Sequence, residues 1–261
     1  MDTPIICLGQ QPSGFFPKRF LYAKIQTARK LQKEIGGRII FFYHDSDADY
    51  RETITLFRDP QNGEDVRLNF TQENKVQKKY SPLYAKIIPA GWKEEIERKL
   101  PRLVSKDLVN TFKDAEGKNA ADFCLDMYQK LGLLEGIEIV RSGDKNFRNQ
   151  ADELQTEFYA DVPFENEIVR AEMNEGKLRL HEGGGKYFNI EAPETIEKWQ
   201  KNPGRDYRFA WMQSVLHCSH YIAGAGENAY LKKEDFPNVV FVARDQIEDS
   251  TYAYLPEILN N

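Results

Sequence analysis

Residues Cys7–Gly14 read CLGQQPSG, and this glycine-bracketed turn decides the fold that the sequence predicts. An apolar strand is expected over Pro4–Leu8, just before the turn. After the turn, apolar residues recur at helical spacing from Phe20 to Leu31, with lysine and arginine on the opposite side. A strand, a glycine turn and a helix bring backbone amides and a helix N-terminus to the mouth of a sheet, an arrangement that favours a phosphate or another anion.

The rest of the chain alternates strands and helices. Gly36-Gly37 should end the first helix, and residues 38–43 read as a second buried strand that completes a βαβ unit. Further helices are expected over 92–100, 105–112, 119–131 and 207–216, and further strands over 137–140, 220–223 and 239–242. This order predicts an α/β fold with a doubly wound, all-parallel sheet in a single domain of residues 1–261.

Residues 156–192 differ from the rest of the chain in the pattern of their polar and apolar residues. Polar and apolar residues alternate over Ile168–Met173 and Lys177–Leu180, on either side of an Asn-Glu-Gly turn, and a further strand is expected at Tyr187–Ile190. We therefore expect residues 156–192 to form an inserted antiparallel β-hairpin element. The polar stretch that follows the second strand carries a turn signal at Asp59–Gly63.

Composition and charge exclude several classes of function. The chain has 36 basic and 41 acidic residues and a net charge of −5, so no broad nucleic-acid surface is expected. No run approaches the roughly 20 apolar residues that cross a bilayer, and the first residues lack the plan of a signal peptide. The three cysteines lie far apart in apolar surroundings, which fits a reducing compartment. We expect a cytoplasmic protein that acts on a small molecule, with no membrane partner and with its oligomeric state left open.

Polar and glycine-rich residues follow three of the predicted strands. The first strand runs into Gly9–Gly14, the second into His44–Asp49, and the fourth into Gly224–Asn228. Because the carboxyl ends of parallel strands meet at one edge of a sheet, these segments should build a small-molecule site there. The predicted cofactor-binding residues are Gly9, Gln10, Gln11, Ser13, Gly14, Gly224, Gly226, Glu227 and Asn228.

The predicted catalytic residues are His44, Lys18 and Asp45. His44 directly follows a buried strand, where it could transfer a proton or contact a phosphate; a hydrogen-bonded structural histidine is the alternative. Lys18 and Arg19 open the first helix, and the pair could hold an anionic substrate or simply lie in solvent.

The acidic run Asp45, Asp47 and Asp49 has two interpretations. Its carboxylate oxygens suit a hard cation. Alternating aspartates also begin turns and cap helices, and the run lacks the glycine and the distal glutamate of a calcium loop. The turn is the favoured interpretation, so no metal ligand is assigned.

The strand-end motifs resemble those of the bacillithiol-synthesis cysteine ligase family, whose members have a Gly-Gln-Gln turn, a His-Asp acidic motif and a late glycine-glutamate turn. The matching residues here are Gly9–Gln11, His44–Asp47 and Gly224–Glu227. The layout is also similar to the nucleotidylyl-transferase fold of class I aminoacyl-tRNA synthetases. The resemblance implies a Rossmann-like sheet, ATP or another adenine nucleotide with Mg²⁺, and a ligase-like enzyme that joins an amino acid, for instance cysteine, to a small acceptor.

Two functions remain open from the sequence. In the first, the strand-end residues hold a nucleotide or a thiol-type metabolite, Lys18 neutralises its charge and His44 moves a proton. In the second, the chain kept the fold and pocket of a ligase but lost catalysis, and serves as a ligand-binding protein. The absence of two synthetase signatures favours the second function. These signatures are a His-x-Gly-His motif after the first turn and a Lys-Met-Ser-Lys-Ser-like loop after the last strand.

Overall fold

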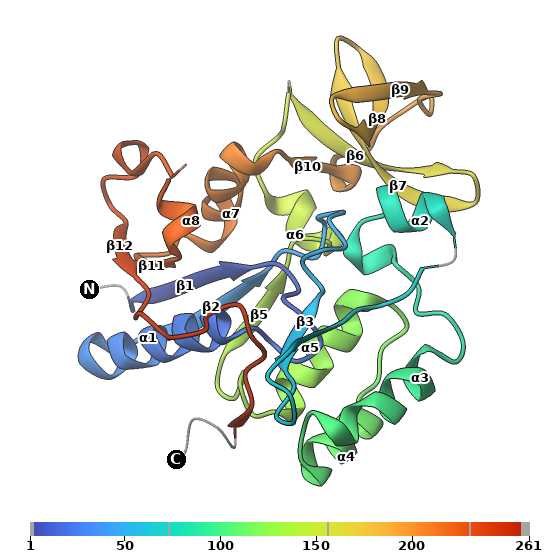
Figure 1. Ribbon diagram of the computed structural model, residues 1–261. Helices are drawn as coiled ribbons and strands as arrows, with labels where there is room; N and C mark the ends of the chain where they lie inside the picture. Colours follow the sequence, from blue (N-terminus) through green and yellow to red (C-terminus); the bar gives the residue numbers. More distant parts are fainter. Residues whose placement is uncertain (1–2, 73, 156, 230, 257–261) are drawn as a thin grey trace.

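The structure, a computed structural model, describes residues 3–72, 74–155, 157–229 and 231–256 (Figure 1). Its centre is a sheet of five parallel strands in the order β12-β11-β1-β2-β5. The predicted parallel sheet of an α/β fold is confirmed, and each strand lies within two residues of its expected range. These strands are β1 (Ile5–Gln10), β2 (Arg38–Tyr43), β5 (Glu138–Arg141), β11 (His220–Ala223) and β12 (Val240–Ala243).

The central strands are apolar throughout because helices cover both faces of the sheet. Side chains alternate between the faces, so Ile6 and Leu8 of β1 join one hydrophobic core and Cys7 joins the other. The first core includes α1 (Arg19–Ile35) and α5 (Ala120–Lys130), and the second includes α6 (Lys145–Gln150) and α7 (Arg208–Leu216).

The direction in which strands are added to the sheet reverses at β1. From β1 the chain continues through β2 to β5 on one side, and later returns through β11 to β12 on the other. The connections that leave β1 and β11 therefore diverge, and a crevice opens outside the carboxyl ends of these strands. This is the place where open α/β sheets bind their ligands.

The inserted β element is larger than the predicted hairpin. The hairpin is present as β7 and β8, but it belongs to a five-stranded antiparallel sheet with its own hydrophobic core (Figure 1, upper right). The sequence did not reveal β6 because Asp161 and Pro163 interrupt its apolar pattern. Thr156, the first residue of the predicted element, lies outside the described residues. The sheet consists of β6 (Phe158–Phe164), β7 (Glu167–Asn174), β8 (Lys177–Gly183), β9 (Lys186–Ile190) and β10 (Lys201–Pro203).

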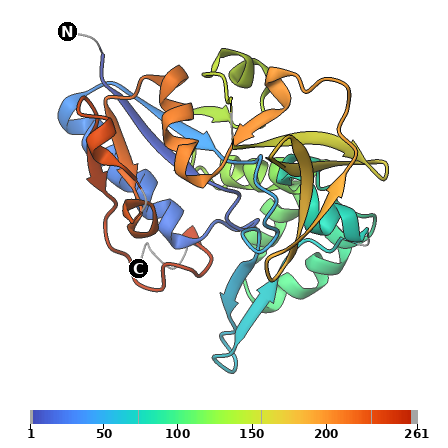
Figure 2. The same cartoon turned by 90° about the horizontal axis from the view of Figure 1, so that it is seen from above.

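The segment between β2 and β5 contains a second feature that the sequence did not reveal. The turn at Asp59–Gly63 joins two short antiparallel strands, and Figure 2 shows this hairpin projecting from the body of the protein. The remaining elements of the structure are β3 (Thr55–Arg58), β4 (Asp65–Leu68), α2 (Lys75–Tyr80), α3 (Trp92–Lys99), α4 (Lys106–Asp114) and α8 (Ala225–Asn228), with short 3₁₀ helices η1 (Leu83–Ala85), η2 (Leu100–Arg102), η3 (Lys198–Gln200), η4 (Arg205–Tyr207) and η5 (Lys233–Asp235). Within the described ranges, no helix combines the length and apolar character needed to cross a membrane.

The first turn of α1 is covered by the segment that follows β12. The amides of Arg19 and Phe20 donate to the carbonyls of Tyr252 (2.8 Å) and Ser250 (2.9 Å). The ring of Tyr254 stacks on that of Tyr22 at 4.3 Å. Amides of a first helical turn have no partner within the helix, and here another segment supplies partners for two of them. The expectation that this helix end opens toward an anion is therefore corrected.

Candidate functional site

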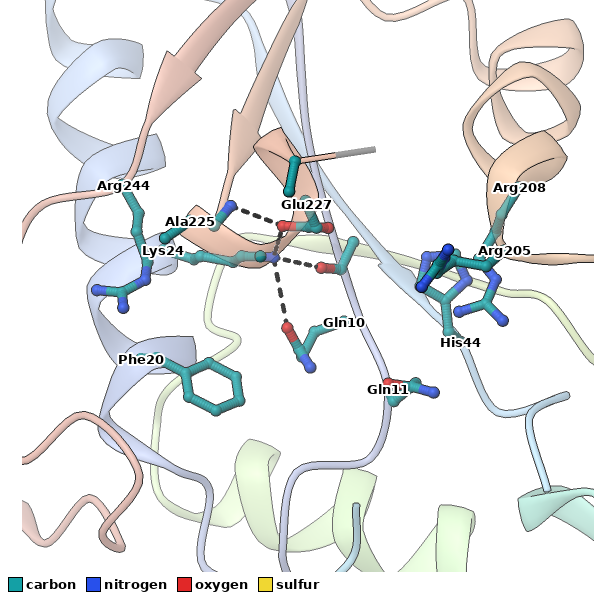
Figure 3. A pocket seen from close by; sticks show the side chains of 14 residues that line it. Gln10, Gln11, Phe20, Lys24, His44, Arg205, Arg208, Ala225, Glu227 and Arg244 are labelled. Atoms are coloured by element: carbon teal, nitrogen blue, oxygen red, sulfur yellow. Dashed lines mark hydrogen bonds and ion pairs between the residues drawn. The ribbon is translucent and has the colours of Figure 1, made fainter. Parts of the chain in front are cut away.

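A pocket of about 540 Å³ occupies the crevice between β1 and β11 (Figure 3). It brings together the segments that follow β1, β2 and β11, as the strand-end motifs predicted. The predicted residues that line it are Gly9, Gln10, Gln11, His44, Gly224, Gly226 and Glu227. Its other lining residues are Phe20, Lys24, Arg205, Arg208, Ala225, Ala229 and Arg244.

Lys24 and Glu227 form an ion pair at the centre of this pocket. The Lys24 side chain is only 2% exposed, and its Nζ lies 2.5 Å from Glu227 Oε2. Lys24 Nζ also donates to the carbonyl of Gly9 (2.7 Å), and it lies 3.4 Å from Gln10 Oε1. Glu227 accepts further bonds from the Tyr221 hydroxyl (2.9 Å) and the amide of Gly224 (2.6 Å). The pair therefore fastens α1 to the turn after β11.

Gly9 is needed where β1 passes between two side chains. A Cβ atom at this position would lie 2.6 Å from the Tyr221 hydroxyl and 2.9 Å from His44 Nε2. The sequence predicted Gly9 as a cofactor-binding residue. In the structure, the absence of a side chain at Gly9 leaves room for these two polar groups of the protein.

His44 lies in the pocket at the end of β2 and is 8% exposed. The edge of its ring packs against Phe42 at 4.6 Å, and its Nδ1 has no hydrogen-bond partner among the described residues. Burial, assisted by the positive charges of Arg208 and Lys24, holds the pKa of His44 well below 6.5, although Asp47 acts in the opposite direction. His44 is therefore neutral at pH 7 and able to accept a proton or a hydrogen bond.

This low pKa predicts that the protein loses stability in mild acid. As the pH falls below about 6.5, His44 takes up a proton in the unfolded chain but not in the folded protein. The free energy of unfolding should then fall by at most about 1.4 kcal/mol per pH unit, until the folded-state pKa is reached. We expect the melting temperature of His44→Gln to depend less on pH between 7 and 5 than that of the unaltered protein. Parallel profiles for the two proteins would contradict the prediction.

Asp47 connects Gln11 to Arg208 across the pocket wall. Its Oδ2 accepts from Gln11 Nε2 (2.6 Å) and from Arg208 Nη2 (2.9 Å). Burial alone would raise the pKa of Asp47, but Arg170 and Arg208 hold it well below its usual range. Asp47 is thus a permanent anion that positions two lining side chains. The sequence analysis named Asp47 as a member of the acidic run but did not predict this role.

The aspartates on either side of Asp47 also face guanidinium groups. Asp45 is fully buried and accepts from Arg141 Nε (2.6 Å) and from the amide of Gly143 (2.7 Å). Burial raises the pKa of Asp45, and Arg141 opposes the shift. Asp49 accepts from Arg51 through both carboxylate oxygens. The run therefore makes ion pairs, and Asp45 links β2 to β5 away from the pocket.

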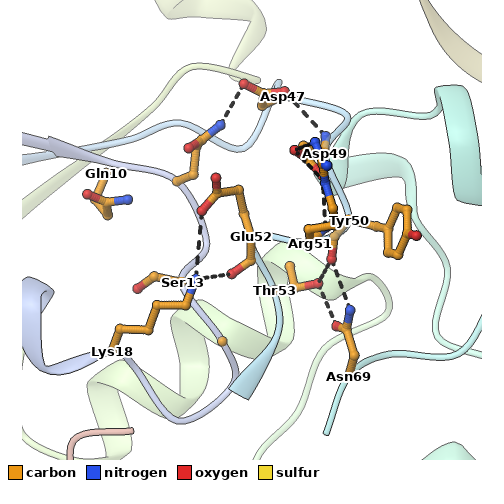
Figure 4. A network of polar contacts seen from close by, with 12 residues as sticks. Gln10, Ser13, Lys18, Asp47, Asp49, Tyr50, Arg51, Glu52, Thr53 and Asn69 are labelled. Atoms are coloured by element: carbon orange, nitrogen blue, oxygen red, sulfur yellow. Dashed lines mark hydrogen bonds and ion pairs between the residues drawn. The ribbon is translucent and has the colours of Figure 1, made fainter. Parts of the chain in front are cut away.

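Lys18 does not line the pocket. Figure 4 shows its side chain directed at Glu52, whose carbonyl oxygen lies 3.1 Å and carboxylate oxygen 3.8 Å from Lys18 Nζ. Burial lowers the pKa of Lys18, and Glu52 opposes the shift. The catalytic role predicted for Lys18 would need a side chain that lines the pocket, and the lysine that lines it is Lys24.

Three of the predicted cofactor-binding residues also lie outside the pocket lining. Ser13 is fully buried, and its amide donates to the Tyr128 hydroxyl (2.8 Å), which in turn donates to the carbonyl of Gly14 (2.7 Å). Gly14 has a φ of 88°, which glycine adopts without strain. Asn228 ends α8, where its amide donates to the carbonyl of Gly224 (3.1 Å). Ser13 and Gly14 thus shape the turn after β1 from inside the core.

The sequence analysis did not assign Lys24, Arg205 or Arg208 to the pocket. For Lys24 a signal was present, because it follows Leu21 by three residues and precedes Ala28 by four, within the apolar stripe of α1. A lysine in such a stripe must find a buried partner. Arg205 and Arg208 carry no comparable signal, since they reach the pocket from the chain that returns from the antiparallel sheet (Figure 3).

No protein-family model and no curated protein matches the chain. What the pocket can bind therefore has to follow from its own residues. It offers several cations, one neutral histidine and the side-chain amides of Gln10 and Gln11, at the edge of a parallel sheet.

Proposed function

We propose that the pocket binds an anionic small molecule with a phosphate group, such as ATP or another adenine nucleotide. One observation carries the proposal: four cations, Lys24, Arg205, Arg208 and Arg244, line the pocket. Glu227, Asp206 and Asp47 pair with the first three in that order, so the pocket keeps one positive charge in excess and several N–H donors. Arginine guanidinium groups match phosphate oxygens in geometry and charge. Mg²⁺ would enter with the nucleotide, because it is held mainly by phosphate oxygens and water.

We further propose a Rossmann-like fold of the nucleotidylyl-transferase type and a ligase-like reaction that joins an amino acid, for instance cysteine, to a small acceptor. Numbering the parallel strands along the chain gives the order 3-2-1-4-5, which is that of dinucleotide-binding sheets. Of the motifs that resemble the cysteine ligase family, Gly9–Gln11, His44 and Gly224–Glu227 line one pocket. His44 is neutral and lines the pocket beside the arginines, so its ring can accept a hydrogen bond from an attacking amine or thiol.

A second candidate function is ligand binding without catalysis. It is favoured by the position of Lys18 and Asp45, which were predicted to be catalytic but lie outside the pocket lining, each held by an ion pair. The two candidates share the pocket and its ligand. They differ in whether the bound nucleotide is consumed.

Titration with ATP, ADP and AMP, each with and without Mg²⁺, tests the binding by calorimetry. The variant Arg205→Gln/Arg244→Gln should bind the preferred nucleotide at least about tenfold more weakly, since each charge-assisted contact contributes about 1.5–3 kcal/mol. Its matched control is Arg38→Gln/Arg98→Gln, which removes the same charge from exposed positions on β2 and α3. Equal affinities in the two variants, or no binding by the unaltered protein, would refute the proposal.

Release of AMP or ADP in the presence of amino acids then separates the two candidates. Turnover that is lost in His44→Gln while nucleotide affinity persists supports the ligase. Binding without any turnover across the amino acids supports the ligand-binding protein.

A further inference from the structure

A second cavity, of about 570 Å³, lies where the antiparallel sheet meets the loop after β2. It shares no lining residue with the pocket at β1 and β11. The loop contributes Ala48, Asp49, Tyr50 and Arg51, the end of α2 contributes Lys79 and Tyr80, and the sheet contributes Tyr159, Arg170, His181, Glu182, Gly183 and Gly184.

Arg170 is the distinctive cation of this cavity. Its guanidinium stacks on the ring of Tyr159, with 3.7 Å from the guanidinium carbon to the ring centre. Its Nε donates to Asn202 Oδ1 (2.7 Å) and its Nη2 to the carbonyl of Pro203 (3.0 Å). Both partners are uncharged, and among the described residues Arg170 makes no salt bridge within 4.0 Å.

The acid that acts most strongly on Arg170 is already engaged elsewhere. Asp47 attracts the Arg170 guanidinium from a distance, but its carboxylate is bonded to Gln11 and Arg208. Arg170 therefore keeps an unmatched positive charge, held in a fixed orientation by Tyr159 and Asn202. A planar guanidinium in this state is suited to an anion with a planar pair of oxygens.

The other charged groups of the cavity are matched with one another. Asp49 and Arg51 pair at 2.7 Å (Figure 4), and Lys79 lies 3.9 Å from Glu182. These pairs leave one positive charge in excess. The tyrosine rings among the lining residues add flat, largely apolar walls.

We propose that this second cavity binds a small molecule with a carboxylate, which lies against the Arg170 guanidinium while a flat or apolar part of the molecule contacts the tyrosine rings. A single cation without an ion pair suits a singly charged carboxylate, whereas the four cations of the first pocket, paired or not, offer the several N–H donors that a polyphosphate requires. The proposal stands on the second cavity alone. If the ligase-like reaction is correct, this site would hold the second substrate.

The two sites are neighbours through Asp47. Its carboxylate holds Gln11 and Arg208, which line the first pocket, and acts on Arg170, which lines the second cavity. A small cavity of about 200 Å³ also shares Arg205 with the first pocket and Tyr159 with the second. A molecule at Arg170 would therefore lie close to a ligand at β1 and β11.

Calorimetric titration with benzoate, succinate and glutamate tests the site, with benzamide as the uncharged counterpart of benzoate. We expect at least one carboxylate to bind, and benzoate to bind at least about tenfold more tightly than benzamide. The Arg170→Gln variant should lose at least tenfold in carboxylate affinity, whereas Arg170→Lys should retain part of it. The matched control is Arg179→Gln, because Arg179 also stacks on a tyrosine of the same sheet, Tyr187, but is paired with Glu172.

A further variant keeps the proposal testable if Arg170→Gln fails to fold. Ala48→Phe fills the cavity and leaves Arg170 in place, so it should abolish carboxylate binding while the melting temperature and nucleotide affinity persist. Binding by none of the three carboxylates, or equal binding by the unaltered protein and Arg170→Gln, would overturn the proposal. Failure of the nucleotide proposal would appear separately, in the Arg205→Gln/Arg244→Gln variant.

Discussion

Replacement of Asp161 with alanine is expected to lower the free energy of unfolding by about 3–5 kcal/mol, because it leaves a buried guanidinium without its counter-ion. The side chains of Asp161 and Arg148 are each 1% exposed, and Asp161 Oδ2 lies 2.6 Å from Arg148 Nη1. Asp161 also accepts from the Tyr84 hydroxyl (2.6 Å) and from Asn202 Nδ2 (3.2 Å). The ion pair between Asp161 and Arg148 joins β6 of the antiparallel sheet to α6 beside the parallel sheet.

Urea unfolding measures this loss, and two further variants interpret it. In Arg148→Met/Asp161→Val both charges are absent, so the loss should be smaller than in Asp161→Ala. The exposed pair between Arg38 and Glu138 provides the comparison, since Glu138→Ala should cost no more than about 1 kcal/mol. A loss below about 1 kcal/mol in Asp161→Ala would contradict the role assigned to the buried pair.

The second large effect is expected for Lys24→Met, with a loss of about 3 kcal/mol in the free energy of unfolding. The Glu227 carboxylate, 18% exposed, would lose its cation and retain, among the described residues, the hydrogen bonds from the Tyr221 hydroxyl and the Gly224 amide. The estimate is at the lower end for such pairs because water still reaches Glu227. Thermal and urea unfolding give the loss directly.

Lys24→Met/Glu227→Gln is the control for this prediction. It removes the stranded charge, so it should recover part of the stability lost in the single variant. Because Lys24 is also one of the pocket cations, nucleotide affinity should remain low in both variants. Recovered stability together with recovered affinity would show that Lys24 acts only as a structural partner of Glu227.

The sequence alone was sufficient to predict the parallel sheet and the edge of the sheet at which the pocket lies. The strands of that sheet are short, apolar and separated by helices, so local pattern determines them. The pocket edge followed from a general property of parallel strands, and Gly9, His44 and Glu227 were found in this way.

The other features of the fold and of the site depend on contacts between residues that are far apart in the sequence. Lys18 directly precedes α1 and Lys24 lies within it, and no local pattern reveals that Lys18 meets Glu52 whereas Lys24 meets Glu227 in the pocket. Ser13 resembles a ligand contact until Tyr128, far along the chain, is found bonded to it. The strand β6 was hidden because its buried Asp161 has a partner, Arg148, that no local pattern reveals.

The cover over the first turn of α1 has a consequence for the order in which the protein folds. Two amides of α1 are bonded to carbonyls at Ser250 and Tyr252, and β1 pairs with β11 from Ile6 and His220 onward, next to a hydrogen bond between Ile5 and Ser219 that spans 214 residues. On a ribosome, β1 and α1 emerge long before β11, so one edge of β1 stays unpaired until the chain has been made as far as β11. Such long-range closure makes folding slow, and the nascent chain must meanwhile shield an apolar strand edge that becomes the centre of the finished sheet.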